Sequence, residues 1–227
     1  MVSAILLAGG SGSRMQQSVP KQFLPLAGRP MILHTLERFE KIEEIDEVIV
    51  VCHAQYREQL EANITSYALR KKYIVVSGGD TRQESTYIGL QNAGNDTIIL
   101  HEAARPFVTV AEFAAMIRDE AKTSTYGIPI PFTVSLTDGE QITGLLERSK
   151  LVNIQLPQKF DRKQLLAAHE RAAADGLVFT EDASLLFHYT GEAAKVLKGT
   201  SYNVKITDSV DLLTGEIIYK EYIIGRD

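Results

Sequence analysis

The sequence predicts an α/β protein, a Rossmann-like α/β/α sandwich around a mostly parallel sheet with a projecting β-hairpin arm. Three observations support this prediction. Short apolar runs alternate with helical patterns through the first half of the chain, as they do where helices cover both faces of a parallel sheet. These runs end in glycine-rich or charged loops. Further on, Asp138-Gly139 separates two extended segments, which is a strong signal for a hairpin.

The expected elements follow one another in a regular order. Residues 2–7 form an apolar run that fits a buried strand. Proline and glycine then keep the chain irregular until about Met31. Two helices begin with capping boxes, Thr81 with Glu84 and Thr109 with Glu112. Further strands are expected at 47–51, 73–76, 97–100 and 202–206, and helices at 31–41, 55–64, 81–93, 110–122, 161–174, 181–189 and 209–219.

The length of 227 residues and a hydrophobic content of 44% predict a single domain spanning 1–227. The extended segments 128–137 and 141–147 interrupt the α/β pattern, and we assign them to an arm at about 128–160. A projecting hairpin leaves unpaired strand edges that a second subunit can cover. We therefore expect a homodimer held together by this arm.

Composition restricts the class of partner. The net charge of -5 leaves no basic excess for nucleic-acid binding. No run of 18 apolar residues predicts a membrane span, and the first residues lack the pattern of a signal peptide. The single cysteine, Cys52, excludes an internal disulfide and suits a reducing compartment. We expect a cytoplasmic protein that does not bind membranes.

The most informative segment follows the first strand. It is a loop of small residues, 8–13, whose backbone amides can surround anionic oxygens, and Arg14 and Lys21 add two cations. These groups suit a triphosphate undergoing phosphoryl transfer. The loop contains no Gly-Lys pair, which excludes a P-loop, and Met15 interrupts a dinucleotide fingerprint. An ordinary glycine-rich turn between strand and helix stays open as an alternative.

Other polar residues follow later strands of the expected sheet. In open α/β sheets, ligands bind outside the carboxyl ends of the strands. This edge would carry the loop after the first strand together with 78–80, 101–106, Lys205 and Thr207. The sequence therefore predicts a ligand site where glycines, acids and cations gather.

Six motifs occur in an order that resembles one known family. They are LAGGSGSRM, PKQFLPLAGRP, GGDTRQES, HEAARPF, LPQKF and YNVKITDSVDL. The chain resembles the 2-C-methyl-D-erythritol 4-phosphate cytidylyltransferases and the related ribitol-5-phosphate cytidylyltransferases over essentially its whole length. The resemblance implies a nucleotide-diphospho-sugar transferase type of fold. It also implies transfer of CMP from CTP to the phosphate of a small polyol phosphate, with Mg²⁺ as cofactor and release of pyrophosphate.

The resemblance also implies roles for individual residues. The catalytic cations would be Arg14, Lys21 and Lys205. Residues matching the acceptor site are Glu102, Arg148, Leu156 and Thr207, with Glu102 also near the metal. Residues matching the CTP site are Leu7, Ala8, Gly9, Gly10, Ser11, Gly12, Gly79, Asp80, Ser85 and Arg105.

Three residues depart from the family's usual pattern, and all three bear on the acceptor. Glu102 stands in place of Asp, Leu156 in place of Thr, and Val134 where Asp is more common. The acceptor is therefore left open between 2-C-methyl-D-erythritol 4-phosphate, which leads to isoprenoid precursors, and ribitol or glycerol phosphate, which lead to cell-surface polymers. A sugar-1-phosphate nucleotidyltransferase and an inactive nucleotide-binding regulatory protein stay open as alternative functions.

Overall fold

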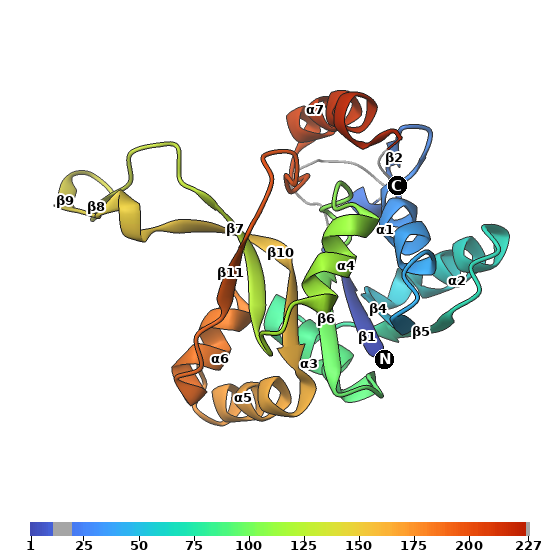
Figure 1. Ribbon diagram of the computed structural model, residues 1–227, viewed down its shortest axis with the longest axis horizontal. Helices are drawn as coiled ribbons and strands as arrows, with labels where there is room; N and C mark the ends of the chain where they lie inside the picture. The colour runs from blue at the N-terminus through green and yellow to red at the C-terminus, as the bar shows by residue number, and fades with distance from the viewer. Residues whose placement is uncertain (11–19, 226–227) are drawn as a thin grey trace.

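A seven-stranded sheet forms the centre of the computed structural model, which describes residues 1–10 and 20–225 (Figure 1). The order of the strands across it is β11-β7-β10-β6-β1-β4-β5. Among these strands, β10 runs antiparallel to both neighbours and the other pairs are parallel, which confirms the predicted mostly parallel sheet. The strands are β1 (Val2–Ala8), β4 (Ile45–Cys52), β5 (Lys72–Ser77), β6 (Thr97–Glu102), β7 (Ser124–Pro129), β10 (Val152–Asp161) and β11 (Lys195–Lys198).

Helices cover both faces of this sheet, as the alternating pattern predicts. One face carries α1, α2 and α4 and the other carries α3, α5 and α6. The main helices are α1 (Met31–Glu40), α2 (Arg57–Ser66), α3 (Arg82–Asn92), α4 (Val110–Arg118), α5 (Arg162–Ala174), α6 (Asp182–Thr190) and α7 (Ser209–Ile218). Shorter elements are η2 (Lys21–Phe23), β2 (Pro25–Leu26), β3 (Arg29–Pro30), η3 (Ala54–Tyr56), η4 (Arg148–Lys150) and the π-helical η5 (Tyr219–Ile223).

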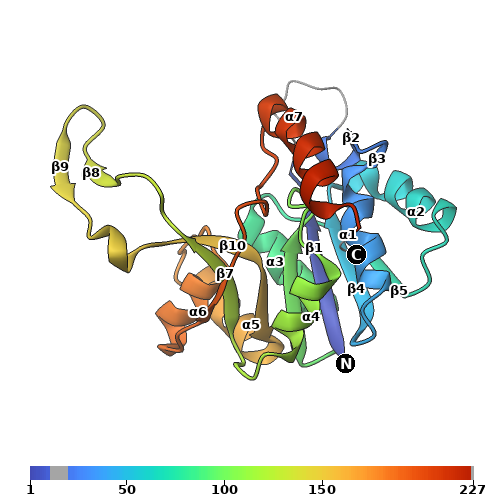
Figure 2. The same ribbon diagram turned by 45° about the horizontal axis from the view of Figure 1, so that its top comes forward.

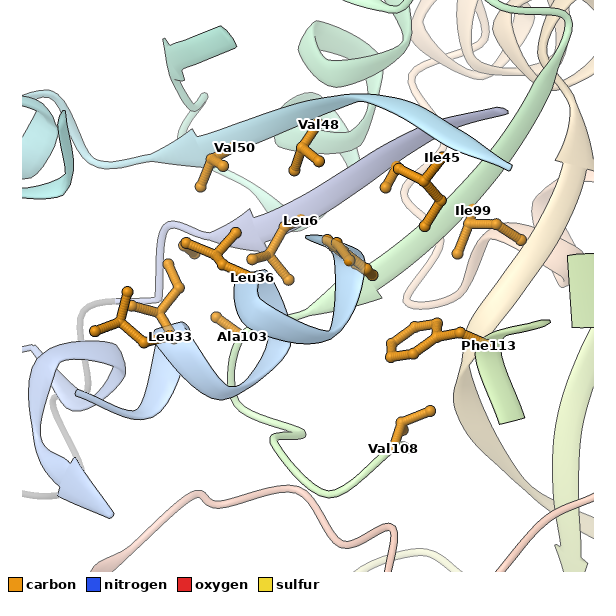
Figure 3. Packing of buried hydrophobic residues seen from close by; sticks show 14 of the residues in the cluster. Leu6, Leu33, Leu36, Ile45, Val48, Val50, Ile99, Ala103, Val108 and Phe113 are labelled. Carbon is orange, nitrogen blue, oxygen red and sulfur yellow. The ribbon is translucent and has the colours of Figure 1, made fainter. Parts of the chain in front are cut away.

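The core forms because side chains of β1 alternate between the two faces of the sheet. Ala4 and Leu6 join the cluster under α1 and α4, whereas Ile5 and Leu7 join the cluster under α3, α5 and α6. Figure 3 shows the first cluster, in which Leu6 lies among side chains of α1 and β4. Both faces of β1 are buried, so the loop that follows it begins from a fixed point.

Capping boxes fix the beginnings of the helices near the carboxyl edge of the sheet. Thr81 caps α3 with Glu84, and Thr109 caps α4 with Glu112, as the sequence predicts. The structure adds a third capping box, Asp208 with Asp211, at the beginning of α7. The first turn of each of these helices is thus held against the loop before it.

The predicted hairpin arm projects from the body of the molecule (Figures 1 and 2). Its tip is formed by β8 (Ser135–Thr137) and β9 (Ile142–Leu145), which pair antiparallel. Asp138 accepts the backbone N–H groups of Glu140 and Gln141, and Gly139 has a φ of +107°, a conformation that glycine adopts without strain. The arm joins the sheet through β7 and β10, so residues 152–160 of the expected arm belong to the sheet.

One predicted strand is wrong, and three strands of the central sheet were missed. Residues 202–206 form an irregular segment beside the loop after β6, where the backbone N–H of Ile206 donates to Ala104 O. The missed strands are β7, of which only residues 128–129 fall in an expected extended segment, β10 and β11. In β10 the register shifts between Gln155 and Gln158, around Pro157, which interrupts the alternating pattern that identifies a strand.

Candidate active site

The carboxyl ends of β1, β5 and β6 open onto a cavity of about 470 Å³. Its position agrees with the general rule for ligand sites in open α/β sheets. Ten of the predicted site residues line it: Leu7, Ala8, Gly9, Gly10, Lys21, Gly79, Asp80, Ser85, Glu102 and Lys205. Residues far apart in the sequence are thus brought together by the sheet.

Glycines at 78 and 79 let the loop after β5 pass close to the beginning of α3. A Cβ on Gly79 would lie 2.5 Å from the Cβ of Glu84, and one on Gly78 would lie 2.8 Å from the Oγ of Ser85. The Glu84 carboxylate accepts the backbone N–H of Asp80 at 2.7 Å. Any larger residue at 79 would displace this capping contact, so the loop depends on glycine there.

Lys21 lies beside Gly10, and the η2 turn that contains it is attached to the end of β1. Its Nζ donates to Ile206 O at 3.0 Å, and a Cβ on Gly10 would lie 3.7 Å from its Cε. The next residue, Gln22, is buried and donates from Nε2 to Ala8 O at 2.7 Å. The Gln22 contact fixes the end of β1 and the lysine relative to each other.

Glu102, at the end of β6, is surrounded by three cations. Its Oε2 lies 2.7 Å from Lys205 Nζ and 4.0 Å from Arg105 Nε, while its Oε1 accepts from Arg82 Nε at 3.1 Å. Burial alone would raise the pKa of this carboxyl, but Lys205 and Arg82 outweigh burial and lower the pKa to about 2. Glu102 is therefore ionised at neutral pH.

Arg82 was missed by the sequence reasoning. It lines the cavity and donates from Nη1 to Asp182 Oδ2 at 2.6 Å, so that its guanidinium connects Glu102 with α6. It belongs to the GGDTRQES motif, but the importance of its side chain depends on a partner 100 residues away. The other missed lining residues are Gln22, His53, Thr81, Ala103 and Ala104.

Buried side chains hold the loop that follows Glu102. His101 Nε2 lies 2.9 Å from Arg105 O, and Arg38 of α1 donates to Pro106 O at 2.5 Å. Arg105 in turn donates to Asn203 O at 3.0 Å. Burial lowers the pKa of His101 to about 3, which makes this imidazole a neutral structural group.

Four predicted residues lie away from the cavity lining. Arg105 packs behind it, and Thr207 is held by Asp211, whose carboxylate accepts the Thr207 hydroxyl. Leu156 is buried in the core on the α5 face and offers its carbonyl to Asn203. Arg148 lies on the arm, where it donates to Pro131 O at 3.4 Å. Ser11, Gly12 and Arg14 lie outside the described residues.

Carboxylates suited to a divalent cation are few at this site. Within residues 1–10 and 20–225, no three His, Cys, Asp or Glu side chains gather as a metal site would need. Asp80 and Glu102 both line the cavity. A Mg²⁺ ion that is held mainly by substrate phosphates needs only one or two carboxylates, which this pair can supply. The residues present therefore fit a substrate-bound metal.

The fold and the cavity define an α/β nucleotidyltransferase. The family model described as 2-C-methyl-D-erythritol 4-phosphate cytidylyltransferase matches residues 2–221. This chain belongs to that family, and the prediction of a CTP-dependent cytidylyltransferase is confirmed.

Individual relatives support the same conclusion. A 2-C-methyl-D-erythritol 4-phosphate cytidylyltransferase from Halalkalibacterium halodurans is 34% identical, with 96% of this chain and 97% of the relative covered. One from Geobacillus kaustophilus is 35% identical, with 95% of each covered. The crystal structure of 4-diphosphocytidyl-2C-methyl-D-erythritol synthase from Anaerococcus prevotii is similar at a TM-score of 0.84 and 28% identity, covering 96% of each chain.

Proposed function

We propose that this enzyme transfers CMP from CTP to the phosphate of 2-C-methyl-D-erythritol 4-phosphate and releases pyrophosphate. The observation that carries the proposal is the convergence of Lys21 and Lys205 on one cavity that Gly9 and Gly10 also line. The matching family model and the relatives described above carry the name of this acceptor.

The chemistry follows from the charges of the two substrates. The acceptor is a phosphate monoester, whose oxygen is already a nucleophile at neutral pH, so the reaction needs no protein base. An acceptor oxygen attacks the α-phosphorus of CTP, and the bond to pyrophosphate breaks. The enzyme must hold two anions in line and neutralise charge on the leaving group. Lys21, Lys205 and Arg14 are assigned to this task.

The base of CTP is assigned to the loop after β5. Gly79, Asp80 and Ser85 line the same cavity and provide backbone and side-chain donors and acceptors. A site that both accepts from the cytosine amino group and donates to the ring oxygen rejects uracil. We expect kcat/KM for CTP to exceed that for UTP by at least about tenfold; equal values would contradict this assignment.

A divalent cation completes the proposed site. Mg²⁺ would be held chiefly by the triphosphate with Asp80 or Glu102 as a protein ligand, and it would neutralise charge on the phosphates. The ion pairs of Glu102 with Lys205 and Arg82 compete with direct binding to the metal.

The arm supports a homodimer as the working unit. Four of its apolar side chains, Phe132, Leu136, Ile142 and Leu145, are more than half exposed in one chain, which favours their burial against a partner. We infer that Arg148 of each arm serves the acceptor phosphate bound by the other subunit. Thr207 is the proposed contact on the subunit's own side.

Ribitol 5-phosphate is the second candidate acceptor, because Glu102 and Leu156 both differ from the usual residues of the methylerythritol enzymes. Of the two, Glu102 lines the cavity, where an enlarged acid changes which hydroxyls of the acceptor find partners. Cytoplasmic location stays a prediction. Of the helices that the structure describes, each is too short or too polar to cross a membrane.

One experiment tests the donor and the acceptor together. Pyrophosphate release is measured with CTP and, in turn, 2-C-methyl-D-erythritol 4-phosphate, ribitol 5-phosphate and glycerol 3-phosphate. We expect the highest kcat/KM with the first acceptor. Preference for ribitol 5-phosphate would favour the second candidate, and release with none of the three would contradict the proposed function.

A double variant tests the acceptor assignment from the protein side. Glu102→Asp with Leu156→Thr restores the usual residues and should increase the preference for 2-C-methyl-D-erythritol 4-phosphate over ribitol 5-phosphate. The single variants serve as matched controls. An unchanged ratio of kcat/KM would show that these two positions do not select the acceptor.

A further inference from the structure

Arg82 bridges two carboxylates that come from different elements. Its Nε lies 3.1 Å from Glu102 Oε1 on β6, and its Nη1 lies 2.6 Å from Asp182 Oδ2 on α6. The second oxygen of Asp182 lies 3.0 Å from Nε2 of His169 on α5. A continuous chain of polar contacts therefore runs from His169 through Arg82 and Glu102 to Lys205 at the cavity.

Because the carboxylates that Arg82 contacts are buried, each of them requires a partner in a fixed position. The side chains of Asp182 and His169 are 2% and 1% exposed, and that of Glu102 is 9% exposed. A buried carboxylate is costly unless it is paired and hydrogen-bonded, so each acid needs its partner in place. The planar guanidinium of arginine holds two carboxylates in fixed directions, which an ammonium cannot do.

The neighbouring residue Gln83 provides a natural comparison. Its side chain accepts the backbone N–H of Phe179 at 2.6 Å and donates to Leu177 O at 3.1 Å. Gln83 thus attaches the beginning of α3 to the connection between α5 and α6, and Arg82 attaches it to the first residue of α6. Of the two, Arg82 is the one that reaches Glu102 and lines the cavity.

We propose that Arg82 is a positioning residue for the acceptor: it orients the Glu102 carboxylate, using Asp182 on α6 as its anchor. This inference rests on the proposed role of Glu102 in acceptor binding. A glutamate side chain has one more rotatable bond than the family's usual aspartate, so it needs more external restraint to keep one geometry. Arg82 engages Oε1, which leaves Oε2 directed to Lys205.

The test replaces Arg82 by lysine, which keeps the positive charge but removes the planar guanidinium that bonds to two carboxylates at once. A misplacement of about 1 Å at a reacting group costs about 10²-fold, so Arg82→Lys should lower kcat/KM for the acceptor by about that factor. The dissociation constant of CTP should change less than about twofold. Arg118→Lys, at an exposed ion pair with Glu44, is the matched control and should behave as the wild type.

A second readout separates orientation from general stability. Lys205, Arg82 and Arg105 face Glu102, and Asp182 lies behind Arg82. In Arg82→Lys, one of the three cations is held less firmly against Glu102, so the pKa of Glu102 should rise by roughly one unit. Carbon-13 NMR of the Glu102 carboxyl carbon measures this pKa without any substrate. Gln83→Ala, which weakens the same connection, should leave that pKa unchanged.

The outcomes are distinct. Normal acceptor kinetics in a folded Arg82→Lys protein, an equal loss in Gln83→Ala, or an unchanged Glu102 titration would each overturn the proposal. If Arg82→Lys does not fold, Asp182→Asn removes the anchor and should lower acceptor kcat/KM by about tenfold; no change would also overturn it. Absence of turnover in the wild type would refute the proposed function, whereas the NMR titration would still test the role of Arg82.

Discussion

Replacing Glu102 by glutamine tests how much the ion pairs of the site contribute to stability. The substitution keeps the shape of the side chain and removes its charge. Lys205 then loses the carboxylate at 2.7 Å, and Arg82 loses one of its two. Arg82 keeps Asp182 and Arg105 keeps its bond to Asn203 O, so the remaining cations are not wholly unpaired.

The magnitude can be worked out in two ways. Breaking a buried ion pair costs about 3–5 kcal/mol, and the contacts that remain place this case near the lower limit. The pKa of Glu102 falls from 4.5 to about 2, and at about 1.4 kcal/mol per unit this difference corresponds to about 3 kcal/mol. Both routes lead to the same order of magnitude.

The pH dependence has a definite sign. A carboxyl whose pKa is lowered in the folded protein stabilises it fully above the unfolded value of 4.5, and this contribution is lost as the pH falls toward about 2. About 2 kcal/mol of it should be lost by pH 3. Urea unfolding of wild type and Glu102→Gln from pH 7 to pH 3 measures the difference. A difference below about 1 kcal/mol at pH 7, or one that does not shrink on acidification, would refute this reasoning.

Three further predictions address other parts of the chain. Lys21→Ala, and likewise Arg14→Ala, should lower kcat by about 10²–10³ in a folded protein, and near-normal turnover would remove that residue from the proposed machinery. Deleting residues 136–146 should give a monomer in sedimentation with intact CTP binding but poor acceptor use; a full-length protein that sediments as a monomer at micromolar concentration would contradict the arm's role. In Gly199→Ala, the new Cβ would lie 2.2 Å from Gln155 Oε1 and displace the turn before Lys205. We expect a loss of about 1–3 kcal/mol in the free energy of unfolding by urea titration, together with lower kcat, and unchanged values would show that the turn yields without cost.

Much of the fold could be predicted because local patterns and the fold agree. Apolar runs gave β1, β4, β5 and β6, and the capping boxes located the beginnings of α3 and α4. The failures lie where local pattern and tertiary structure diverge. The alternation in 202–206 resembles a strand, but its polar groups bond to loops: Asn203 Nδ2 donates to Leu156 O, and the backbone of Ile206 donates to Ala104 O.

In the candidate site, too, some residues could be predicted from the sequence and others could not. The rule for strand ends brings Gly79 and Glu102 to the glycine loop without knowledge of side-chain contacts. The pairing of Arg82 with Asp182 cannot be derived in this way, because it joins the first residue of α3 to the first residue of α6 across 100 positions. Composition and spacing carry no information on which of many charged residues meet across such a distance.

The ion pair between Glu102 and Lys205 positions the lysine when the protein folds, before any substrate binds. Cations that must neutralise phosphates need to be in position before the substrates arrive, because reorganisation during the reaction would raise its barrier. Within residues 1–10 and 20–225, four cations lie in or behind the cavity (Lys21, Arg82, Arg105 and Lys205), and they would repel one another without a buried acid between them. Glu102 is that acid, since its carboxylate contacts three of the four. In the proposed reaction, phosphate oxygens then compete with Glu102 for Lys205, and the carboxylate is available to the acceptor only while Arg82 holds its other oxygen.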